Sequence, residues 1–429
     1  MSPTATPDRS RAPVGLPRLL PAGGRAAGGP VLAAHLAQHG PLPYRGASHV
    51  LIDVVEAAGV TGRGGAAFPT ARKMRAVAAG RSPIVVANGS EGEPAAWKDK
   101  TLLAHAPHLV LDGLQLAAEA VGSREAYLYL HRDATLVRSI DAVLAERRAR
   151  GIDRVDITVI TAPLRFLAGE ESALVSRVEG GAALPRSTPP RVFESGVRGR
   201  PTLVQNVETL AHVALVARHG ADWYRALGTA DEPGSMLVTV HRADRGARVM
   251  EAARGTALLD VVGPLDDARA VLVGGYHGAW IRPEVAAGLR LLDVDLRPHG
   301  AALGAGVLAV LPSDRCGVRE TARVATYLAL ESAGQCGPCL NGLPRIAAAL
   351  ERLAEPAPAA GVLADVQRWC GLVEGRGACH HPDGTTRFVR SALAVFADEF
   401  TFHASGRCSG RDGRAFLPTE PASRTDDWS

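Results

Sequence analysis

Three cysteines toward the C-terminal end have the clearest potential for metal chemistry. Cys336 and Cys339 form a C-x-x-C pair, and Cys379 follows after a longer interval. Thiolates in such an arrangement ligate iron–sulfur clusters, which normally take four cysteines. The position that would complete a C-x-x-C-x-x-C run holds Ala333, whose methyl group has no lone pair to donate. The sequence therefore predicts a cluster site with three assigned ligands and one open position.

The open position leaves three arrangements: a three-iron cluster ([3Fe–4S]) on the three cysteines, a four-iron cluster ([4Fe–4S]) completed by another side chain, or no cluster. We expect the four-iron cluster. Its fourth ligand would be a thiol or an imidazole, since both bind iron in clusters, and the candidates are Cys316, Cys370, Cys408, His380 and His381. Among them, Cys370 is expected to be a buried small hydrophobe, whereas Cys408 follows the last expected helix and could fold back. Zinc is the main inorganic alternative, because it accepts thiolates together with an imidazole such as that of His380.

The composition limits the class of protein. A chain of 429 residues with 46% hydrophobic side chains can form two or three domains. Its 48 basic and 44 acidic side chains are interspersed, which argues against nucleic-acid binding. All six cysteines lie in the last third, a clustering that fits metal ligation in a reducing compartment better than a disulfide framework. No apolar run reaches the roughly 20 residues that cross a bilayer, so we expect a cytoplasmic protein without direct membrane insertion.

The pattern of apolar residues predicts an α/β domain over residues 48–230. Residues 1–14 are expected to form a disordered tail and residues 15–47 a lead-in segment. Apolar strands then alternate with amphipathic helices, which indicates a mostly parallel sheet. The expected helices cover 48–58, 107–121, 135–149 and 206–219, and the expected strands cover 84–87, 126–131 and 157–161.

Two further domains follow in the sequence. Residues 234–313 contain short strands separated by glycine turns, and His277 in one such turn is expected at the surface. Residues 316–405 are expected to be helical with the cysteines in the connections, and residues 406–429 to be a flexible tail. The expected strands cover 236–240, 270–273 and 307–311, and the expected helices cover 317–332, 344–355, 361–373 and 386–402.

A glycine-rich loop precedes an expected helix that begins near Pro69. Its sequence, Gly62-Arg63-Gly64-Gly65-Ala66-Ala67-Phe68, lets the backbone approach a phosphate while the helix directs free N–H groups at the anion. Lys73 could add a positive charge on the same side. A tight loop without a ligand would need the same glycines, so this motif alone does not decide between the two interpretations.

Three more polar segments lie where ligands bind in α/β domains. Asn88, Glu91 and Glu93 follow the strand 84–87, at the carboxyl edge of the sheet. They could serve a planar heterocycle and a ribose, or form a solvated acidic loop. The other two segments, Gly169-Glu170-Glu171 and the run from Gly199 to Leu210 that contains Asn206 and Thr209, both lead into helices. Helix capping would account for much of their composition.

Taken in order, these segments resemble the flavin-binding, NADH-oxidising F-type subunit of respiratory complex I and its relatives in NAD-linked hydrogenases and formate dehydrogenases. The family motifs are G-R-G-G-A-G-F-P-T-G, N-A-D-E-x-E-P-G-x-x-K-D, G-E-E-T-A-L, G-K-P-T-x-x-N-N-V-E-T-L and E-S-C-G-x-C-x-P-C-R-x-G, and Lys98-Asp99 match the K-D that ends the second. Their counterparts here begin at Gly62, Asn88, Gly169, Gly199 and Glu331, and the resemblance covers about residues 48–402.

The resemblance implies a fold and a function. The fold is a Rossmann-like flavin domain, a β-grasp domain of the soluble-ligand-binding type and a helical iron–sulfur bundle. The implied activity is that of an NADH dehydrogenase (quinone)-like oxidoreductase subunit. FMN would take a hydride from NADH or NADPH and pass electrons to a [4Fe–4S] cluster, and then to a ferredoxin or another subunit of a redox complex. No side chain needs to act as a general acid or base, because the cofactor carries the chemistry.

The resemblance also implies roles for individual residues. The FMN phosphate would lie against Gly62, Arg63, Gly64, Gly65 and Lys73, and the flavin ring against Asn88 and Glu91. Gly169, Glu170, Glu171, Asn206 and Thr209 would line the same pocket from the other side. Phe68 would contact the adenine of the dinucleotide, Glu93 would lie near it, and the metal ligands would be Cys336, Cys339 and Cys379.

The sequence departs from the family at three further positions. Ser90 replaces an aspartate of the flavin loop, Thr188 replaces a lysine and Arg191 replaces an aromatic residue, the last two at positions that contact NADH in the family. Arg191 could still stack or pair with a phosphate. Two alternative functions therefore stay open: a non-catalytic scaffold within a redox complex, or an FMN protein that exchanges electrons with a ferredoxin or a membrane-bound haem protein instead of NADH.

Overall fold

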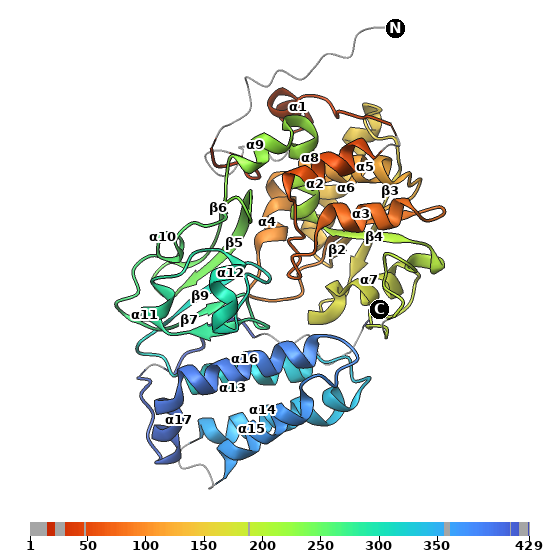
Figure 1. Cartoon of the computed structure of the whole chain (residues 1–429). Coiled ribbons are helices and arrows are strands. Elements are labelled where there is room, and N and C mark those ends of the chain that lie inside the picture. Colours follow the sequence, from red (N-terminus) through yellow and green to blue (C-terminus); the bar gives the residue numbers. More distant parts are fainter. Residues whose placement is uncertain are drawn as a thin grey trace, which may run out of the picture.

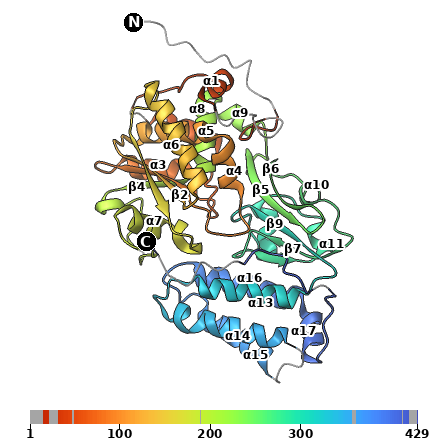
Figure 2. The same cartoon turned by 180° about the vertical axis from the view of Figure 1, so that it is seen from behind.

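The computed structural model describes residues 15–21, 31–46, 49–187, 189–355, 361–411, 413–419 and 428. The expected tail of residues 1–14 lies outside these ranges. Figures 1 and 2 show an α/β domain, a smaller β domain beside it and a layer of helices beneath both. Among the described residues, no helix combines the length and the apolar character needed to cross a bilayer.

The α/β domain is built on a four-stranded sheet whose order is β3-β2-β1-β4. All three neighbouring pairs are parallel, which confirms the predicted parallel sheet and the fold class, although β4 was not among the predicted strands. The strands are β1 (Ile84–Gly89), β2 (Ala126–His131), β3 (Ile157–Ala162) and β4 (Thr202–Asn206). The longer helices around them are α2 (Val50–Ala58), α3 (Thr70–Ala78), α4 (Lys98–His105), α5 (Pro107–Val121), α6 (Ala134–Ala149), α7 (Glu171–Val178) and α8 (Val207–His219).

The strand order places a switch point between β1 and β4. From β1 the chain runs outward to β2 and β3, and it then returns to the opposite side of β1 as β4. Ligands of open α/β sheets bind outside the carboxyl ends of the strands at such a point. Asn88 of β1 lies directly opposite Asn206 of β4 in the register, so the two predicted segments begin side by side.

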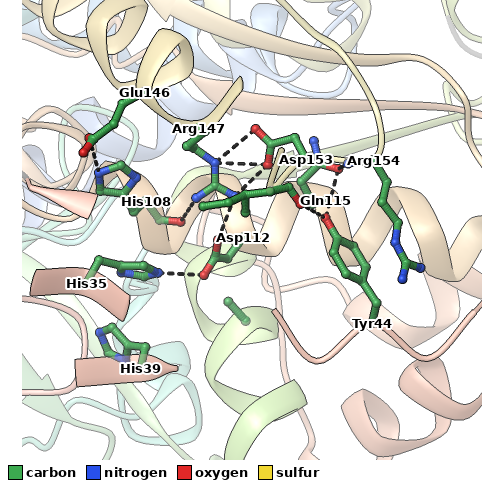
Figure 3. A network of polar contacts seen from close by, with 12 residues as sticks. His35, His39, Tyr44, His108, Asp112, Gln115, Glu146, Arg147, Asp153 and Arg154 are labelled. Carbon is green, nitrogen blue, oxygen red and sulfur yellow. Dashed lines mark hydrogen bonds and ion pairs between the residues drawn. The ribbon is translucent and has the colours of Figure 1, made fainter. Parts of the chain in front are cut away.

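A buried ionic network holds the helices on the far side of this domain together (Figure 3). Asp112 of α5 is fully buried and pairs with His35 of α1 (Leu32–His39) at 2.7 Å, with Arg147 of α6 at 2.8 Å and with Arg218 of α8. Burial alone would raise the pKa of Asp112, but the hydrogen bond from His35 and the charges of the two arginines hold it well below its usual value. One carboxylate therefore joins four helices.

The second domain has a five-stranded mixed sheet with the order β6-β5-β9-β7-β8. β5 and β9 run parallel in the centre, and the other pairs are antiparallel, which is the arrangement of a β-grasp sheet. The strands are β5 (Ser235–Arg242), β6 (Gly246–Ala253), β7 (Ala268–Val273), β8 (Ala279–Ile281) and β9 (Val307–Pro312). Their inner faces share one apolar core with the short helix α10 (Leu258–Val262).

The C-terminal part is helical as expected, but its last predicted helix differs: it begins at His381 instead of 386 and is divided in two. The helices are α13 (Gly317–Leu330), α14 (Leu343–Ala354), α15 (Val362–Val373), α16 (His381–Val395) and α17 (Ala397–Ala404). The prediction of one helix over 386–402 is wrong, because the helix breaks at Phe396. Phe396 is 3% exposed and packs against the ring of Trp280 at 5.4 Å, so tertiary packing decides the break.

The expected flexible tail is also packed in part. The backbone N–H of Arg411 donates to the carbonyl of Asp314 at 2.8 Å. Leu417 is 1% exposed, and its N–H donates to the carboxylate of Glu320 at 2.6 Å. Arg411 and Leu417 therefore lie against the beginning of α13, whereas Trp428 contacts the α/β domain, where its carbonyl accepts the N–H of Ala183 at 2.6 Å.

Candidate functional site

Three of the predicted segments meet at the switch point of the sheet. The side-chain amide of Asn88 donates to the carbonyl of Gly169 at 2.8 Å. The side-chain amide of Asn206 lies 3.5 Å from the carbonyl of Asn88. A Cβ atom on Gly169 would lie only 2.9 Å from the carbonyl oxygen of Ser90, so a larger residue would push these loops apart. The structure thus brings together segments that are up to about 120 residues apart in the sequence.

One polar atom in this region has no partner within the protein. The hydroxyl of Ser90 is buried without a hydrogen bond, while its backbone N–H donates to the side chain of Asn88 at 3.2 Å. Buried hydroxyls are normally paired, because an unpaired one costs roughly 1–3 kcal/mol. Ser90 therefore fits a site whose ligand supplies the missing partner, and it lies where the resembling motif has an aspartate.

The glycine-rich loop lies beside these segments. It closes through a hydrogen bond of 2.9 Å from the N–H of Gly62 to the carbonyl of Phe68, and residues 64–67 are exposed. Gly65 has a φ of +107°, which favours glycine. A Cβ on Gly64 would lie 3.5 Å from the Cβ of Asn206. A cleft lined by Gly62, Gly65, Lys98, Glu208 and residues 304 and 306 of the β domain runs along this loop.

Arg63 and Lys73, both expected at the phosphate, have partners of their own. The guanidinium of Arg63 donates to the hydroxyl of Tyr224 at 3.1 Å and to the carbonyl of Ser235 at 3.0 Å, and its backbone N–H donates to Thr209 at 2.8 Å. Only its Nε is buried without a hydrogen bond. These contacts join the loop to the start of β5, so the side chain of Arg63 is engaged in a contact between domains.

Lys73 lies on the inner side of α3. Its ammonium group donates to the carbonyl of Val204 at 3.0 Å and pairs with the carboxylate of Glu171. Glu171 is partly exposed, whereas Lys73 is almost fully buried. The pair brings α3 and the start of α7 to the same side of the sheet. An anion at the loop would have to compete with Glu171 for this ammonium group.

Glu91 and Glu170, expected to line the flavin pocket, both cap helices. The carboxylate of Glu91 accepts the N–H groups of Asp99 and Lys100 in the first turn of α4, at 3.1 and 3.2 Å. Burial and the neighbouring carboxylate of Asp99 raise the pKa of Glu91 to about 7. The carboxylate of Glu170 accepts two N–H groups at the start of α7, both at 3.0 Å. The capping alternative therefore holds for Glu170, whereas the solvated acidic loop that was left open for Glu91 is wrong, because Glu91 is 6% exposed.

A buried charge network next to the cleft was not assigned a role from the sequence. Lys98 pairs with Asp99 at 2.7 Å and with Glu208 at 2.9 Å, and Asp99 accepts the side-chain amide of Asn206 at 2.6 Å. Burial alone would lower the pKa of Lys98, but the two carboxylates raise it above its usual value. Asn206 is thus held in place by a charged group. A Lys-Asp pair in the first turn of a helix was the signal available in the sequence.

Glu93 lies at the junction with the β domain. It is 8% exposed, and its carboxylate accepts the N–H of Tyr276 at 3.1 Å in the turn after β7. Burial raises the pKa of Glu93 to about 8. The same turn contains His277, and the prediction that it is a surface residue is wrong. His277 is half-buried: its Nε2 lies 3.0 Å from the Nδ1 of His381 in the helical domain, and its ring packs edge-on against Phe166 of the α/β domain.

The aromatic side of the site contains one residue that the sequence analysis missed. Phe68 is half-buried, and its ring lies 6.2 Å from the ring of Phe193, with the guanidinium of Arg72 at 5.7 Å. Phe193 comes two residues after Arg191, which is exposed. Thr188 lies outside the described residues. A second aromatic ring therefore exists near Phe68, although the expected position does not provide it.

The three predicted metal ligands lie close enough to influence one another. Burial and then the neighbouring Cys336 raise the pKa of Cys339 to about 11. The pKa of Cys379 is raised by burial and by the carboxylate of Glu170, as well as by Cys336. The thiols of Cys336 and Cys339, from the connection before α14, thus lie near that of Cys379, from the connection before α16, and near Glu170, the N-cap residue of α7. This donor set fits three ligands of an iron–sulfur cluster next to the loops at the switch point.

The candidates for the fourth ligand can be separated by position. Both ring nitrogens of His381 are engaged, one 3.0 Å from His277 and the other 2.9 Å from the carbonyl of Leu328. Cys370 is fully buried in the apolar core, as predicted. Cys316 and Cys408 lie at the opposite end of α13, and a helix of 14 residues separates its ends by roughly 20 Å. His380, exposed and adjacent to Cys379, is the remaining candidate.

Comparison with known proteins agrees with this geometry. The family described as the Nuo51 FMN-binding domain matches residues 55–215, and the NADH-ubiquinone oxidoreductase-F iron-sulfur binding region matches residues 319–403. One of the NADH-quinone oxidoreductase F subunits of Rhizobium meliloti, the one numbered 2, is 30% identical over 83% of this chain and 89% of its own length. The corresponding protein of Salmonella typhimurium is 29% identical over 82% of this chain and 83% of its own length.

Chains of known structure are also similar to this chain. The NAD+-reducing [NiFe]-hydrogenase in the air-oxidized state contains a chain with a TM-score of 0.78 and 31% identity, covering 90% of this chain and 67% of that one. In the H2-reduced state the TM-score is 0.76 at 32% identity, with 86% of this chain and 64% of that one covered. On this identity and coverage, the chain belongs to the family of the NADH-quinone oxidoreductase F subunits.

Proposed function

We propose that this protein oxidises NADH with a bound FMN and transfers the electrons through a [4Fe–4S] cluster to another subunit of a redox complex. The observation that carries the proposal is the position of Glu170. Glu170 directly follows Gly169, whose carbonyl accepts the side-chain amide of Asn88 at the switch point, and its carboxylate is among the groups that raise the pKa of the Cys379 thiol, after burial. When bound, FMN accepts a hydride and releases electrons one at a time, which is the step that links a dinucleotide to a cluster.

The residues of the crevice would bind and orient the flavin. We assign the phosphate to the glycine loop of Gly62, Gly64 and Gly65, near Lys73, with the backbone N–H groups of the exposed Gly64 and Gly65 as the main donors. The ring would lie against Asn88, Gly169 and Asn206, and it would give the hydroxyl of Ser90 its missing partner. Glu91, Glu170, Glu171, Arg63 and Thr209 would support these groups through caps and ion pairs.

The cluster would be held by Cys336, Cys339 and Cys379, with His380 as the fourth ligand. Two exposed apolar side chains flank the C-x-x-C turn, Leu330 at 54% and Leu340 at 61% exposure. These side chains would be available to contact a partner protein that accepts the electrons. A ferredoxin or a subunit of a larger complex would fit this surface, and we place the protein in the cytoplasm.

The dinucleotide would stack on Phe68, supported by Phe193, with Glu93 nearby. A second candidate function follows from the exposed Arg191 where the family has an aromatic residue. An FMN protein with weak dinucleotide contacts would exchange electrons with reduced ferredoxin instead of NADH.

Anaerobic stopped-flow mixing separates these functions. The purified holoprotein is mixed with NADH, NADPH or a reduced ferredoxin, and flavin absorbance is followed. Rapid bleaching of the flavin by NADH supports the proposal. Bleaching by NADPH but not by NADH would keep the proposed electron transfer and replace NADH by NADPH as the electron donor. Bleaching by ferredoxin but by neither dinucleotide would support the second candidate. A protein without flavin absorbance, even after incubation with FMN, would be a non-catalytic scaffold.

A further inference from the structure

Two cysteines that the cluster does not use form a second group with a histidine. Cys316, His403 and Cys408 place one ligand atom each within 4.8 Å of one another. The Sγ of Cys316 lies 3.2 Å from the Nε2 of His403. Cys316 and His403 are 5% and 2% exposed, and Cys408 is partly buried. A thiol, an imidazole and a second thiol thus converge from residues that are far apart in the sequence.

The fold brings the three side chains together through specific backbone contacts. Cys316 is the N-cap residue of α13, and its sulfur accepts the N–H of Arg319 at 3.4 Å. His403 lies in the last turn of α17. A Cβ on Gly410 would lie 2.7 Å from the backbone nitrogen of Cys316, so only glycine lets the loop after α17 approach this closely.

The carboxylate of Glu399 fixes the loop from the other side. It accepts the N–H of Gly317 at 2.7 Å and the hydroxyl of Ser409, the residue after Cys408. Arg269 of β7 pairs with the same carboxylate at 2.6 Å. The surroundings of the three ligands are therefore ordered by groups that are not themselves ligands, as is usual around metal sites.

We propose that Cys316, His403 and Cys408 bind a zinc ion that fastens the segment after α17 to the N-terminus of α13. Zinc prefers thiolate and imidazole ligands in a tetrahedral arrangement. The N-terminus of a helix favours the thiolate form at Cys316. Binding of Zn²⁺ to the two thiols releases two protons and leaves the imidazole neutral, so the charges balance without an oxidant.

This site is separate from the cluster. Cys316 precedes α13, whereas Cys336 and Cys339 follow it, and the helix of 14 residues spans roughly 20 Å. Two of the three ligands also lie outside residues 319–403, the range that matches the iron–sulfur binding region. Burial raises the pKa of the Cys316 thiol to about 12 and outweighs the opposing effect of the Arg319 N–H, so the thiolate form at Cys316 requires a bound cation.

The test uses the full-length holoprotein, purified without oxygen and without chelators, from cells supplied with zinc. Zinc, iron and FMN are counted in the wild type and in Cys408→Ser, with Cys370→Ala and Cys339→Ser as controls. We expect one zinc per chain in the wild type, loss of zinc but not of iron or FMN in Cys408→Ser, and retained zinc in both controls. The zinc affinity of Cys408→Ser should fall by more than the roughly 10–100-fold that loss of a supporting residue costs.

Zinc-edge X-ray absorption of the wild type keeps the test decisive if a variant fails to fold. The site requires two sulfur ligands at about 2.3 Å and at least one nitrogen ligand at about 2.0 Å. A wild type that contains no zinc and takes up none from added Zn²⁺ would overturn the proposal. So would zinc that is lost in Cys339→Ser, or a disulfide between Cys316 and Cys408 in protein kept under reducing conditions.

Discussion

The carboxylate of Glu93, which follows a strand of the α/β domain, accepts a hydrogen bond of 3.1 Å from the backbone N–H of Tyr276 in the β domain. The neighbouring Gly275 has a φ of +80°, and a Cβ at this residue would lie 2.2 Å from the carboxylate oxygen. The ring of His277 in the same turn contacts Phe166 and His381. The turn after β7 therefore joins all three domains beside the proposed redox site.

Gly275→Ala should destabilise the protein by more than the replacement of a glycine at a positive φ without a steric clash. The added methyl group would collide with Glu93 and would also occupy a backbone conformation that costs roughly 1–2 kcal/mol for a non-glycine residue. Gly300→Ala is the matched control, because Gly300 has a φ of +69° and open space around it. The thermal midpoint of Gly275→Ala should lie clearly below that of Gly300→Ala. Equal midpoints would show that the contact with Glu93 is not tight.

Stability should depend on pH through Glu93. Burial raises the pKa of Glu93 from 4.5 to about 8, so the folded state holds the proton more tightly than the unfolded state. The stabilisation that Glu93 contributes is therefore fully present below pH 4.5, and it is lost as the pH rises through about 8. Glu93→Gln keeps the acceptor oxygen without the charge, and its unfolding midpoint should fall less over this interval than that of the wild type. Parallel pH profiles would contradict the assignment.

Phe68→Ala should weaken dinucleotide binding and leave FMN bound. Loss of one stacking ring and its apolar area corresponds to about 1–2 kcal/mol, which is roughly a fivefold to thirtyfold rise in KM for NADH. Phe193→Ala should act in the same direction with a smaller effect, because Phe193 contacts Phe68, and Phe68→Tyr should restore the wild-type KM. Steady-state kinetics together with FMN content check this prediction. Equal loss of both ligands in Phe68→Ala would contradict separate roles.

Asp112→Ala should be strongly destabilising although it lies far from the site. The substitution would leave Arg147, Arg218 and His35 with uncompensated buried charge or hydrogen-bonding groups, at a cost of roughly 3–5 kcal/mol. Asp365→Ala, which removes an exposed pair with Arg368, should cost less than about 1 kcal/mol. Chemical denaturation of both variants gives the comparison. If Asp112→Ala were as stable as Asp365→Ala, the ionic network around Asp112 would not hold the four helices together.

Local patterns in the sequence were sufficient for most of the fold. The helix α5 and the strand β2 have the predicted bounds, 107–121 and 126–131, because an N-terminal proline, a C-terminal glycine and continuous apolar runs are local signals. The break at Phe396 depends on Trp280, which lies more than 100 residues away. No local pattern encodes that contact, so the helix over 386–402 was predicted in one piece.

The candidate site likewise has parts that the sequence could predict and parts that it could not. The segments at Gly62, Asn88, Gly169 and Asn206 could be found from the sequence, because their glycines and polar residues are contiguous. The capping by Glu91, the position of Phe193 and the group of Cys316, His403 and Cys408 could not, since each depends on distant backbone geometry. His277 was misplaced for the same reason, because the surfaces that cover it come from other domains.

The most direct test is a cofactor count combined with NADH reduction of the same anaerobic sample. One FMN and about four irons per chain, with flavin bleaching followed by a new electron paramagnetic resonance signal from a reduced cluster, is the predicted result. In Cys339→Ser the flavin should still bleach while the signal and the iron are lost. A wild type that binds no FMN, or whose flavin is reduced by NADH without any electron reaching an iron centre, would contradict electron transfer between the crevice and the cysteines.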